Sequence, residues 1–277
     1  MVGDRIHEAV PGATWLGAVV AVDNDVYDRI GDTWWDDDNP LVVLHGSMTA
    51  GRMDYFRGVL ARLGRLPTGK TPPAALDVGS GGGFLAEEFC RLGFAVTGVD
   101  PSAVSIRTAR AHAAAGGLDI EYRLGAGERL PVDDAAFDVA YCSDVLEHVD
   151  DVDRVLAETA RALKPGGVYL FDTLNRTLAS RLATKATQQW RLTRVIDFAA
   201  HDWAMFLPPD ELAARLRRHG LTVQESVGLG PRAKPWTAMA GLVRLRRGHL
   251  TYRQVSERLD MGRTRYKGLF YMGHALH

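Results

Sequence analysis

The chain has 277 residues, of which 46% are hydrophobic and 24% are charged, and its formal net charge is −1. This length and composition are typical of one large globular α/β domain with additional segments, and a near-neutral chain gives no indication of a nucleic-acid partner. The two cysteines, Cys90 and Cys142, do not make a disulfide framework and favour a reducing, cytoplasmic setting.

Residues 1–73 are predicted to form an N-terminal helical cap or arm. Apolar spacing at Val26, Ile30 and Trp34 predicts a short helix in this unit, and a second helix is predicted over about 49–63. A linker that contains Pro and Gly then leads into the rest of the chain. We therefore expect this unit to precede a separate main domain.

Residues 74–277 are predicted to form that main domain, because strand and helix patterns alternate along them. Strands are predicted over about 74–78, 95–99, 119–124, 137–142, 168–172 and 221–226, and residues 269–277 are predicted as a final edge strand. Helices are predicted over about 83–92, 102–116 and 151–163. This alternation predicts an α/β fold with a doubly wound, Rossmann-like, seven-stranded sheet that has helices on both faces.

Two basic segments interrupt the main domain. An insertion over about 176–201 carries five Lys or Arg residues before its first acid, Asp197. It is interpreted either as the solvated face of an inserted cap or as a peripheral contact with anionic lipid at the inner face of a membrane. Residues 226–256 also lack acids, and their role is left open. No run of 18 apolar residues occurs, so no spanning helix is predicted.

A glycine-rich loop follows the first strand, in the run Asp77-Val-Gly-Ser-Gly-Gly-Gly83. Glycine permits a positive φ and lets a ligand lie directly on the backbone. The spacing differs from the dinucleotide pattern G-x-G-x-x-G, and Asp77 would repel a pyrophosphate but accept a hydrogen bond from an ammonium. The loop therefore looks like motif I of class I S-adenosylmethionine methyltransferases. The alternative is an NAD or FAD loop.

Asp100 ends the second predicted strand, where a carboxylate can accept hydrogen bonds from both hydroxyls of a ribose. The alternative is that Asp100 is only an acid at the start of the following helix. Residues Ala126, Gly127 and Glu128 follow the third strand and are expected to contact the adenine.

The run Ser143-Asp-Val-Leu-Glu-His148 follows the fourth strand, whose carboxyl end faces the ligand crevice in this kind of sheet. If a helical turn follows, Asp144, Glu147 and His148 share one face at i, i+3 and i+4. Two carboxylates and an imidazole can hold a divalent cation such as Mg²⁺. The alternatives are a pair of acids at a helix start, or His148 acting alone as a base.

The order of several motifs resembles the O-methyltransferases of ubiquinone biosynthesis, over about residues 25–225. The resemblance rests on Trp34-Trp35-Asp36, Leu44-His45, Arg52, the glycine loop, Val99-Asp100, Asp144-x-x-Glu147-His148, Leu163-Lys-Pro-Gly-Gly167 and Thr173-Leu-Asn-Arg176. It implies a methyltransferase acting on catechol-like hydroxyls of polyprenylated rings. It also implies that Arg52, Gly79, Asp100 and Ser143 bind the cofactor.

The resemblance further implies a metal-binding E-x-x-E-H motif, which falls on Asp144, Glu147 and His148. Asp144 is one methylene shorter than the family's glutamate, Ser80 replaces a cysteine, and Ser143 replaces a bulkier residue. These departures indicate a relative with a substrate of its own.

The sequence thus predicts an S-adenosylmethionine-dependent O-methyltransferase, assisted by Mg²⁺, that acts on a small aromatic or prenylated acceptor. The alternatives are an N- or C-methyltransferase of a natural product and a non-catalytic protein that binds the cofactor. Catalytic and metal-binding roles are predicted for Asp144, Glu147 and His148. The predicted cofactor-binding residues are Arg52, Asp77, Gly79, Ser80, Gly81, Asp100, Pro101, Ala126, Gly127, Glu128 and Ser143.

Overall fold

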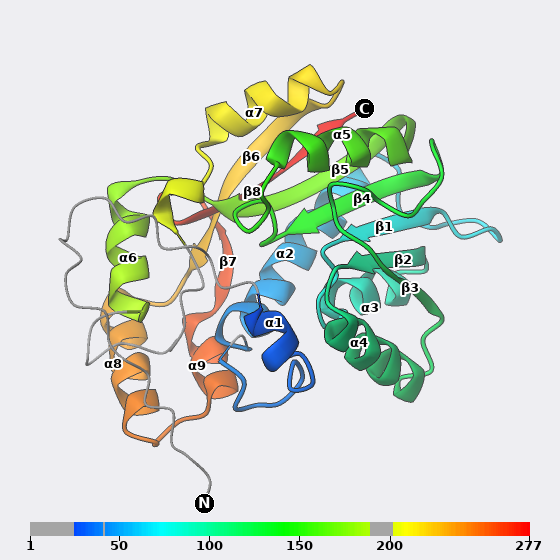
Figure 1. The fold of residues 1–277 in the computed structure, drawn as a ribbon. Coiled ribbons are helices and arrows are strands. Elements are labelled where there is room, and N and C mark those ends of the chain that lie inside the picture. Colours follow the sequence, from blue (N-terminus) through cyan, green and yellow to red (C-terminus); the bar gives the residue numbers. More distant parts are fainter. Residues whose placement is uncertain (1–24, 41, 189–201) are drawn as a thin grey trace, which may run out of the picture.

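A mixed sheet runs through the part of the chain that the structure, a computed structural model, describes: residues 25–40, 42–188 and 202–277 (Figure 1). Its strands are β1 (Ala74–Val78), β2 (Ala95–Asp100), β3 (Ile120–Leu124), β4 (Phe137–Ser143), β5 (Leu163–Leu174), β6 (Thr222–Pro231), β7 (Met261–Thr264) and β8 (Phe270–Leu276). The helices are α1 (Val26–Arg29), α2 (Val42–Arg62), α3 (Phe84–Arg91), α4 (Ala103–Ala115), α5 (Val152–Ala162), α6 (Leu178–Gln188), α7 (Pro209–Arg218), α8 (Pro235–Arg246) and α9 (Tyr252–Leu259), with a 3-10 turn η1 (Trp203–Met205).

The strand order is β3-β2-β1-β4-β5-β8-β6-β7. Strands β1 to β5 pair in parallel, whereas β8, β6 and β7 extend the sheet in antiparallel fashion. The predicted doubly wound α/β fold is confirmed, with eight strands in the described residues where seven were expected. The additional strand is β7, which pairs with the outer side of β6.

The prediction that the C-terminal tail forms an edge strand is wrong. Strand β8 lies between β5 and β6 and pairs with both. Its residues Tyr271 and Met272 are buried on opposite faces of the sheet. A strand that is buried on both faces belongs in the interior of a sheet, and β7 takes the edge.

Helices cover both faces of the sheet, and each face has its own apolar core. Helices α2, α3 and α4 pack on one face, where Phe56, Phe89 and Ile106 are buried. Helices α5 and α7 pack on the other, where Leu156 and Leu216 are buried. This arrangement follows from alternation along the parallel strands, in which successive side chains point to opposite faces.

Helix α2 starts at Val42, earlier than the predicted helix over about 49–63. Gly51 lies within it and lets the start of β7 approach closely, since a Cβ there would lie 2.5 Å from the Met261 carbonyl oxygen. Residues 42–48, for which no element was predicted, are therefore helical as well. The division into 1–73 and 74–277 stays a prediction, because residues 1–24 lie outside the described residues.

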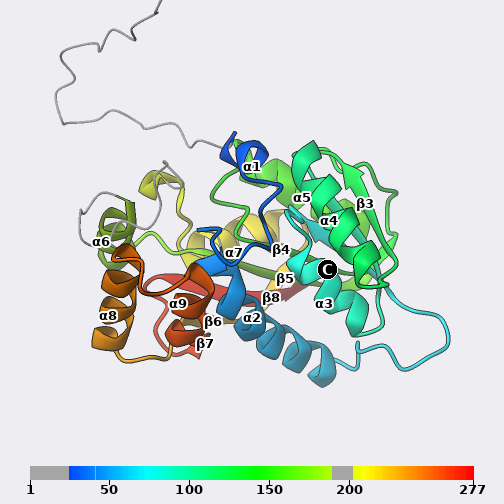
Figure 2. The ribbon, with the colours of Figure 1, turned by 90° about the horizontal axis from the view of Figure 1, so that it is seen from below.

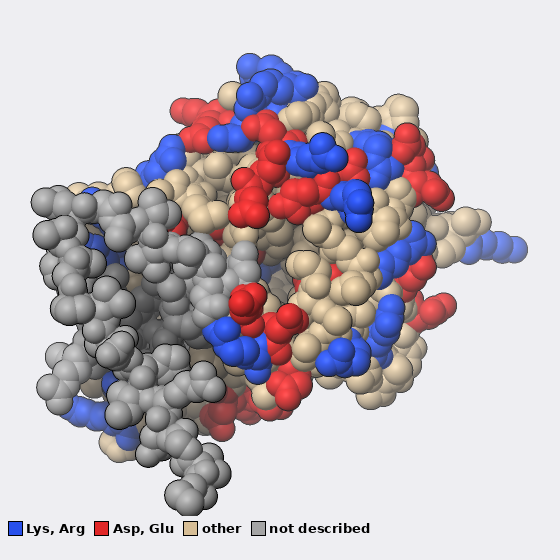
Figure 3. All heavy atoms as spheres, in the orientation of Figure 1, with Lys and Arg blue, Asp and Glu red and all other residues tan. Residues whose placement is uncertain are grey.

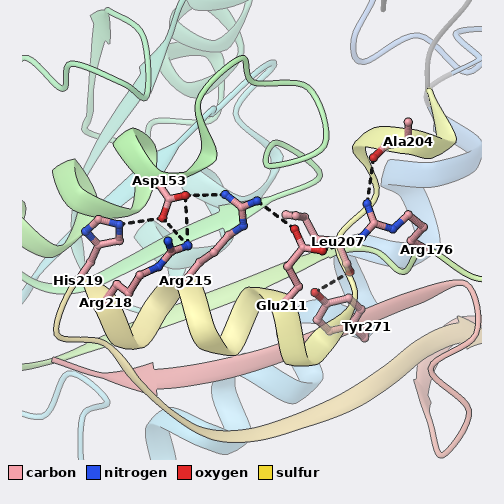
Figure 4. Close-up of polar contacts among 9 residues, drawn as sticks. All are labelled: Asp153, Arg176, Ala204, Leu207, Glu211, Arg215, Arg218, His219 and Tyr271. Atoms are coloured by element: carbon pink, nitrogen blue, oxygen red, sulfur yellow. Dashed lines mark hydrogen bonds and ion pairs between the residues drawn. The ribbon is translucent and has the colours of Figure 1, made fainter. Parts of the chain in front are cut away.

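A polar network ties the end of β5 and helices α5 and α7 together (Figure 4). Arg176 donates to Glu211 on α7 at 2.6 Å and to the Ala204 carbonyl at 3.2 Å. Asp153 on α5 accepts from Arg215 at 2.5 Å and from the His219 ring at 3.1 Å. Arg176, the first residue of the predicted insertion, is thereby joined to α7 and to Ala204 beyond the end of the insertion, whereas residues 189–201 lie outside the described part.

Helices α6, α8 and α9 gather on one side of the molecule, beside β7 (Figure 2). Helices α8 and α9 and strand β7 fall in the basic stretch over 226–256 and its continuation, where no element was predicted. Charges of both signs are interspersed over the described part of the face in Figure 3. Among the described helices, none combines the length and the apolar character needed to cross a membrane.

Candidate active site

A cavity of about 410 Å³ opens at the carboxyl ends of β1, β2 and β4. The strand order reverses beside β1, which is where doubly wound sheets bind their ligands. All the predicted cofactor-binding residues line this cavity: Arg52, Asp77, Gly79, Ser80, Gly81, Asp100, Pro101, Ala126, Gly127, Glu128 and Ser143. The structure therefore brings these residues to one site, and their individual roles as ligands stay predictions.

The glycine loop takes a shape that other residues would not allow. Gly79 has a φ of +78°, and a Cβ on it would lie 2.3 Å from the Val145 side chain. Gly81 also has a positive φ, and its N–H donates to Asp100 at 2.8 Å. The hydroxyl of Ser80 is buried and has no hydrogen-bond partner among the described residues. The loop is thus a close-fitting backbone cradle with a polar group available for a ligand.

Two buried carboxylates face the cavity from the ends of β1 and β2. Burial, followed by the nearby Asp100, raises the pKa of Asp77 well above its usual value. Burial also raises the pKa of Asp100, to about 6, against the effect of the Ser102 and Gly81 amides. Carboxylates in this position favour a ligand that brings a cation or hydroxyl donors and disfavour a phosphate.

Residues 25–40 cover the cavity with aromatic side chains. Tyr27 and Trp34 line it, and the Trp34 indole donates to the Ser105 hydroxyl at 2.9 Å. The neighbouring Trp35 donates to the Gly82 carbonyl at 2.9 Å and stacks on His112 with ring centroids 3.5 Å apart. In the sequence, Trp34 contributed to the predicted short helix and both tryptophans to the family resemblance, but their place over the glycine loop was not predicted.

The prediction that Asp144, Glu147 and His148 share one helical face is not borne out by the geometry. Asp144 has a φ of +53°, and only a short turn closed by the His148 N–H on the Val145 carbonyl follows. Asp144 and His148 line the cavity, whereas Glu147 does not. The turn forms because a left-handed residue directly after β4 prevents a continuous helix.

Each of the two carboxylates is engaged elsewhere. Asp144 forms an ion pair with Arg52, and Glu147 is fully buried and accepts a hydrogen bond from Thr173 at 2.8 Å. Burial, followed by the charge of Asp144, raises the pKa of Glu147 to about 8. Within the described residues, no three His, Cys, Asp or Glu side chains come close enough to hold a metal. The three side chains therefore do not fit the expected Mg²⁺ site.

Arg52 reaches the site from α2 and joins β4 to β5. It donates to Asp144 and, at 2.8 Å, to Asp172 on β5. Burial opposes the charge of Arg52, but the two carboxylates outweigh burial and raise its pKa. Asp172 was missed by the sequence analysis, although an acid near the carboxyl end of a parallel strand was a signal that could have found it.

His148 meets the phenol of Tyr27 at the wall of the cavity. The Tyr27 oxygen lies 3.4 Å from Nε2 of His148, and the two rings meet edge to face at a centroid distance of 5.8 Å. A proton acceptor thus lies beside a phenolic hydroxyl, within the cavity that also contains the glycine cradle.

Comparisons with known proteins agree with this geometry. The methyltransferase domain family matches residues 76–171. A ubiquinone biosynthesis O-methyltransferase from Methylobacterium nodulans is 38% identical over 207 residues, which are 73% of this chain and 82% of that protein. A protein of the same name from Caulobacter vibrioides is 39% identical over 208 residues, again 73% of this chain and 82% of that protein.

A solved structure supports the fold. A SAM-dependent methyltransferase from Thermotoga maritima is similar with a TM-score of 0.57 over 90% of this chain and 99% of that chain. The sequence identity is 18%, so this comparison bears on the fold alone. It agrees with a Rossmann-like methyltransferase sheet.

Proposed function

This chain belongs to the ubiquinone biosynthesis O-methyltransferase family, and on that premise we propose that it methylates a hydroxyl of a small aromatic or prenylated acceptor. It is an S-adenosylmethionine-dependent methyltransferase. The observation that carries the proposal is the single cavity in which the glycine cradle and Asp100 lie together with His148.

The cradle and the two strand-end acids suit the proposed cofactor. S-adenosylmethionine supplies a methyl group that its sulfonium already activates. Asp77 accepts from the ammonium of the methionine part, and Asp100 accepts from the ribose hydroxyls. The backbone at Gly79 and Gly81 lies against the methionine chain, and Ala126 to Glu128 lie against the adenine. These contacts align the methyl group with the acceptor, which supplies much of the rate enhancement.

His148 takes the proton from the acceptor in this proposal. A phenol has a pKa of about 10, so its proton must be removed for efficient attack near neutral pH. The new C–O bond forms as the C–S bond breaks, and the proton passes to Nε2 of His148. The phenolic oxygen of Tyr27 lies 3.4 Å from that nitrogen, a long contact that the acceptor hydroxyl would replace. A phenolic ring can thus approach His148 within the cavity.

The proposed chemistry involves no step through Mg²⁺. Asp144 is paired with Arg52, and Glu147 is buried and does not line the cavity, so these side chains do not fit a shared cation. His148 alone supplies the proton acceptor.

Product analysis tests the function. The full chain would be incubated with labelled S-adenosylmethionine and a panel of catechols, phenols, prenylated rings and amines, and the products identified by mass spectrometry. We expect methyl ethers of hydroxylated rings, and about a 100-fold loss of rate in His148→Gln. Methylation only of amines or ring carbons would favour the alternative transferases. Cofactor binding without any consumption would favour a non-catalytic role.

We further propose that α6 contacts the surface of an anionic membrane. Leu178 and Leu182 are 69% and 49% exposed, and Arg181 and Lys185 are exposed on the same side of the helix. Apolar side chains between cations are the composition of a peripheral lipid contact. A prenylated acceptor would reside in such a membrane. A membrane contact through α6, which follows β5 in the chain, would bring the protein to that acceptor.

Vesicle sedimentation tests the membrane contact. We expect the protein to bind vesicles with anionic lipid more strongly than neutral ones, and salt to weaken that binding. The double change Leu178→Ser and Leu182→Ser should weaken it about tenfold or more, since two apolar side chains are lost. The control Leu124→Ser removes a leucine that is 59% exposed on β3. Equal binding by the control and the double variant would contradict the contact.

A further inference from the structure

Arg52 lies in a buried cluster of charges at the carboxyl ends of β4 and β5. Its side chain is only 2% exposed, and its Nη2 donates both to Asp144 and, at 2.8 Å, to Asp172. Asp172 is fully buried. One guanidinium is therefore held between two carboxylates with little water to screen their attraction.

This cluster includes a carboxylate that the family resemblance assigns to a divalent cation. Asp144 was expected to bind that cation together with Glu147 and His148. Instead, Asp144 binds a guanidinium, and Glu147, which does not line the cavity, accepts a hydrogen bond from Thr173. The positive charge at this position comes from the chain itself.

Arg52 also faces the place where the proposed reaction occurs. It lines the cavity together with His148, and its Nε is buried without a hydrogen-bond partner among the described residues. A guanidinium has five N–H donors in a fixed plane. Arg52 can therefore keep both carboxylates and still direct a donor to a ligand oxygen.

We propose that Arg52 is the resident cation of this site and that the enzyme works without a divalent metal. The guanidinium fills the space between Asp144 and Asp172, so a metal ion could bind Asp144 there only by displacing it. Its charge stabilises the acceptor oxygen as His148 takes the proton, which is the role of an electrostatic stabiliser. This reaction role rests on the proposed function, whereas the occupancy of the site does not.

Manganese binding tests the occupancy without any need for activity. The full chain would be titrated with Mn²⁺ and followed by electron paramagnetic resonance, as wild type, Arg52→Lys and Arg52→Met. We expect no Mn²⁺ site in the wild type or in the lysine variant, which keeps the charge. Arg52→Met removes the guanidinium charge but keeps an unbranched side chain, and we expect this variant to gain one Mn²⁺ site. A stoichiometric site in the wild type, or a folded methionine variant without one, would overturn the proposal.

The rate measured on an acceptor from the product panel tests the metal independence. We expect the wild-type rate in EDTA to stay within about twofold of the rate with added Mg²⁺. We also expect Arg52→Met to lower kcat/KM about 100-fold and Arg52→Lys to lower it less. Loss of wild-type activity in EDTA and its return with Mg²⁺ would overturn the proposal, even if the methionine variant fails to fold. A protein that methylates nothing but lacks a Mn²⁺ site would refute only the proposed function.

Discussion

At the scale of single residues, the cavity is defined by charges placed at strand ends. Asp77 and Asp100 lie at the carboxyl ends of β1 and β2, and Asp144 and His148 follow β4, where Arg52 on α2 pairs with Asp144. Asp77, Asp100 and Arg52 are buried, so their interactions are stronger than they would be in water, whereas Asp144 and His148 are half-buried. The charge of a buried carboxylate such as Asp100 should therefore make the site sensitive to pH.

Cofactor binding should weaken in mild acid because of Asp100. Burial raises the pKa of Asp100 to about 6, and ligand hydroxyls that donate to its carboxylate favour the charged form. As the pH falls through about 6, Asp100 takes up a proton and the affinity should fall by up to about tenfold per pH unit. Calorimetry would measure the affinity for S-adenosylhomocysteine from about pH 5 to about pH 7.5. This range extends about one pH unit or more to each side of the Asp100 pKa.

Asp100→Asn is the control for that pH dependence. The change removes the negative charge of Asp100. We therefore expect the affinity for S-adenosylhomocysteine at neutral pH to be about 10- to 100-fold lower, because hydrogen bonds to a charged acceptor are lost. The affinity of Asp100→Asn for S-adenosylhomocysteine should no longer fall as the pH drops through about 6. An asparagine variant with the same pH profile as the wild type would show that another group is responsible.

At the scale of elements, the segment from α1 to Trp35 acts as a cover over the glycine loop. Trp34 is 4% exposed and contacts the loop closely: a Cβ at Gly82 would lie 2.6 Å from its side chain. Asp28 accepts from the Ser102 hydroxyl at 2.5 Å, which joins the cover to the start of α4. Cofactor binding and the packing of this segment should therefore be linked.

Trp34→Ala should weaken both the fold and the cofactor site. Loss of a buried tryptophan costs about 3–5 kcal/mol in stability, and the glycine loop loses its support, so we expect about tenfold weaker binding of S-adenosylhomocysteine. Urea unfolding and calorimetry would measure the two effects. The control is Trp236→Ala on α8, a tryptophan that is 68% exposed, for which we expect little change. Equal effects of the two changes would contradict the role of the cover.

The elements that could be predicted from the sequence were those whose signals are local. The strand end at Asp77, the glycine spacing and the acid at Asp100 lie within a short stretch, so their pattern indicated both the fold and the site. The pairing of Arg52 with Asp172 could not be predicted, because these residues are 120 positions apart and their contact depends on how α2 packs on the sheet. The position of β8 likewise depends on pairing with both β5 and β6.

At the scale of the whole molecule, the parallel and antiparallel parts of the sheet contribute unequally to the cavity. The parallel part places Asp77, Asp100 and Ser143 and the loops that follow β1, β2 and β4 around the cavity, and Phe270 at the start of β8 adds a contact from the antiparallel part. The network around Arg176 and Asp153 fixes the end of β5 to α7 (Figure 4). Ion pairs of Arg176 with Glu211 and of Arg215 with Asp153 thus join the chain after β5, helix α5 and helix α7.

The atom that receives the methyl group is the most direct test of the account. The full chain would be supplied with S-adenosylmethionine carrying a ¹³C methyl group and with a catechol acceptor from the panel, and the product would be examined by NMR. We predict that the label appears as a methoxy carbon on the ring. A label attached to nitrogen or to a ring carbon, or a label that stays on the cofactor with every hydroxylated acceptor, would contradict it.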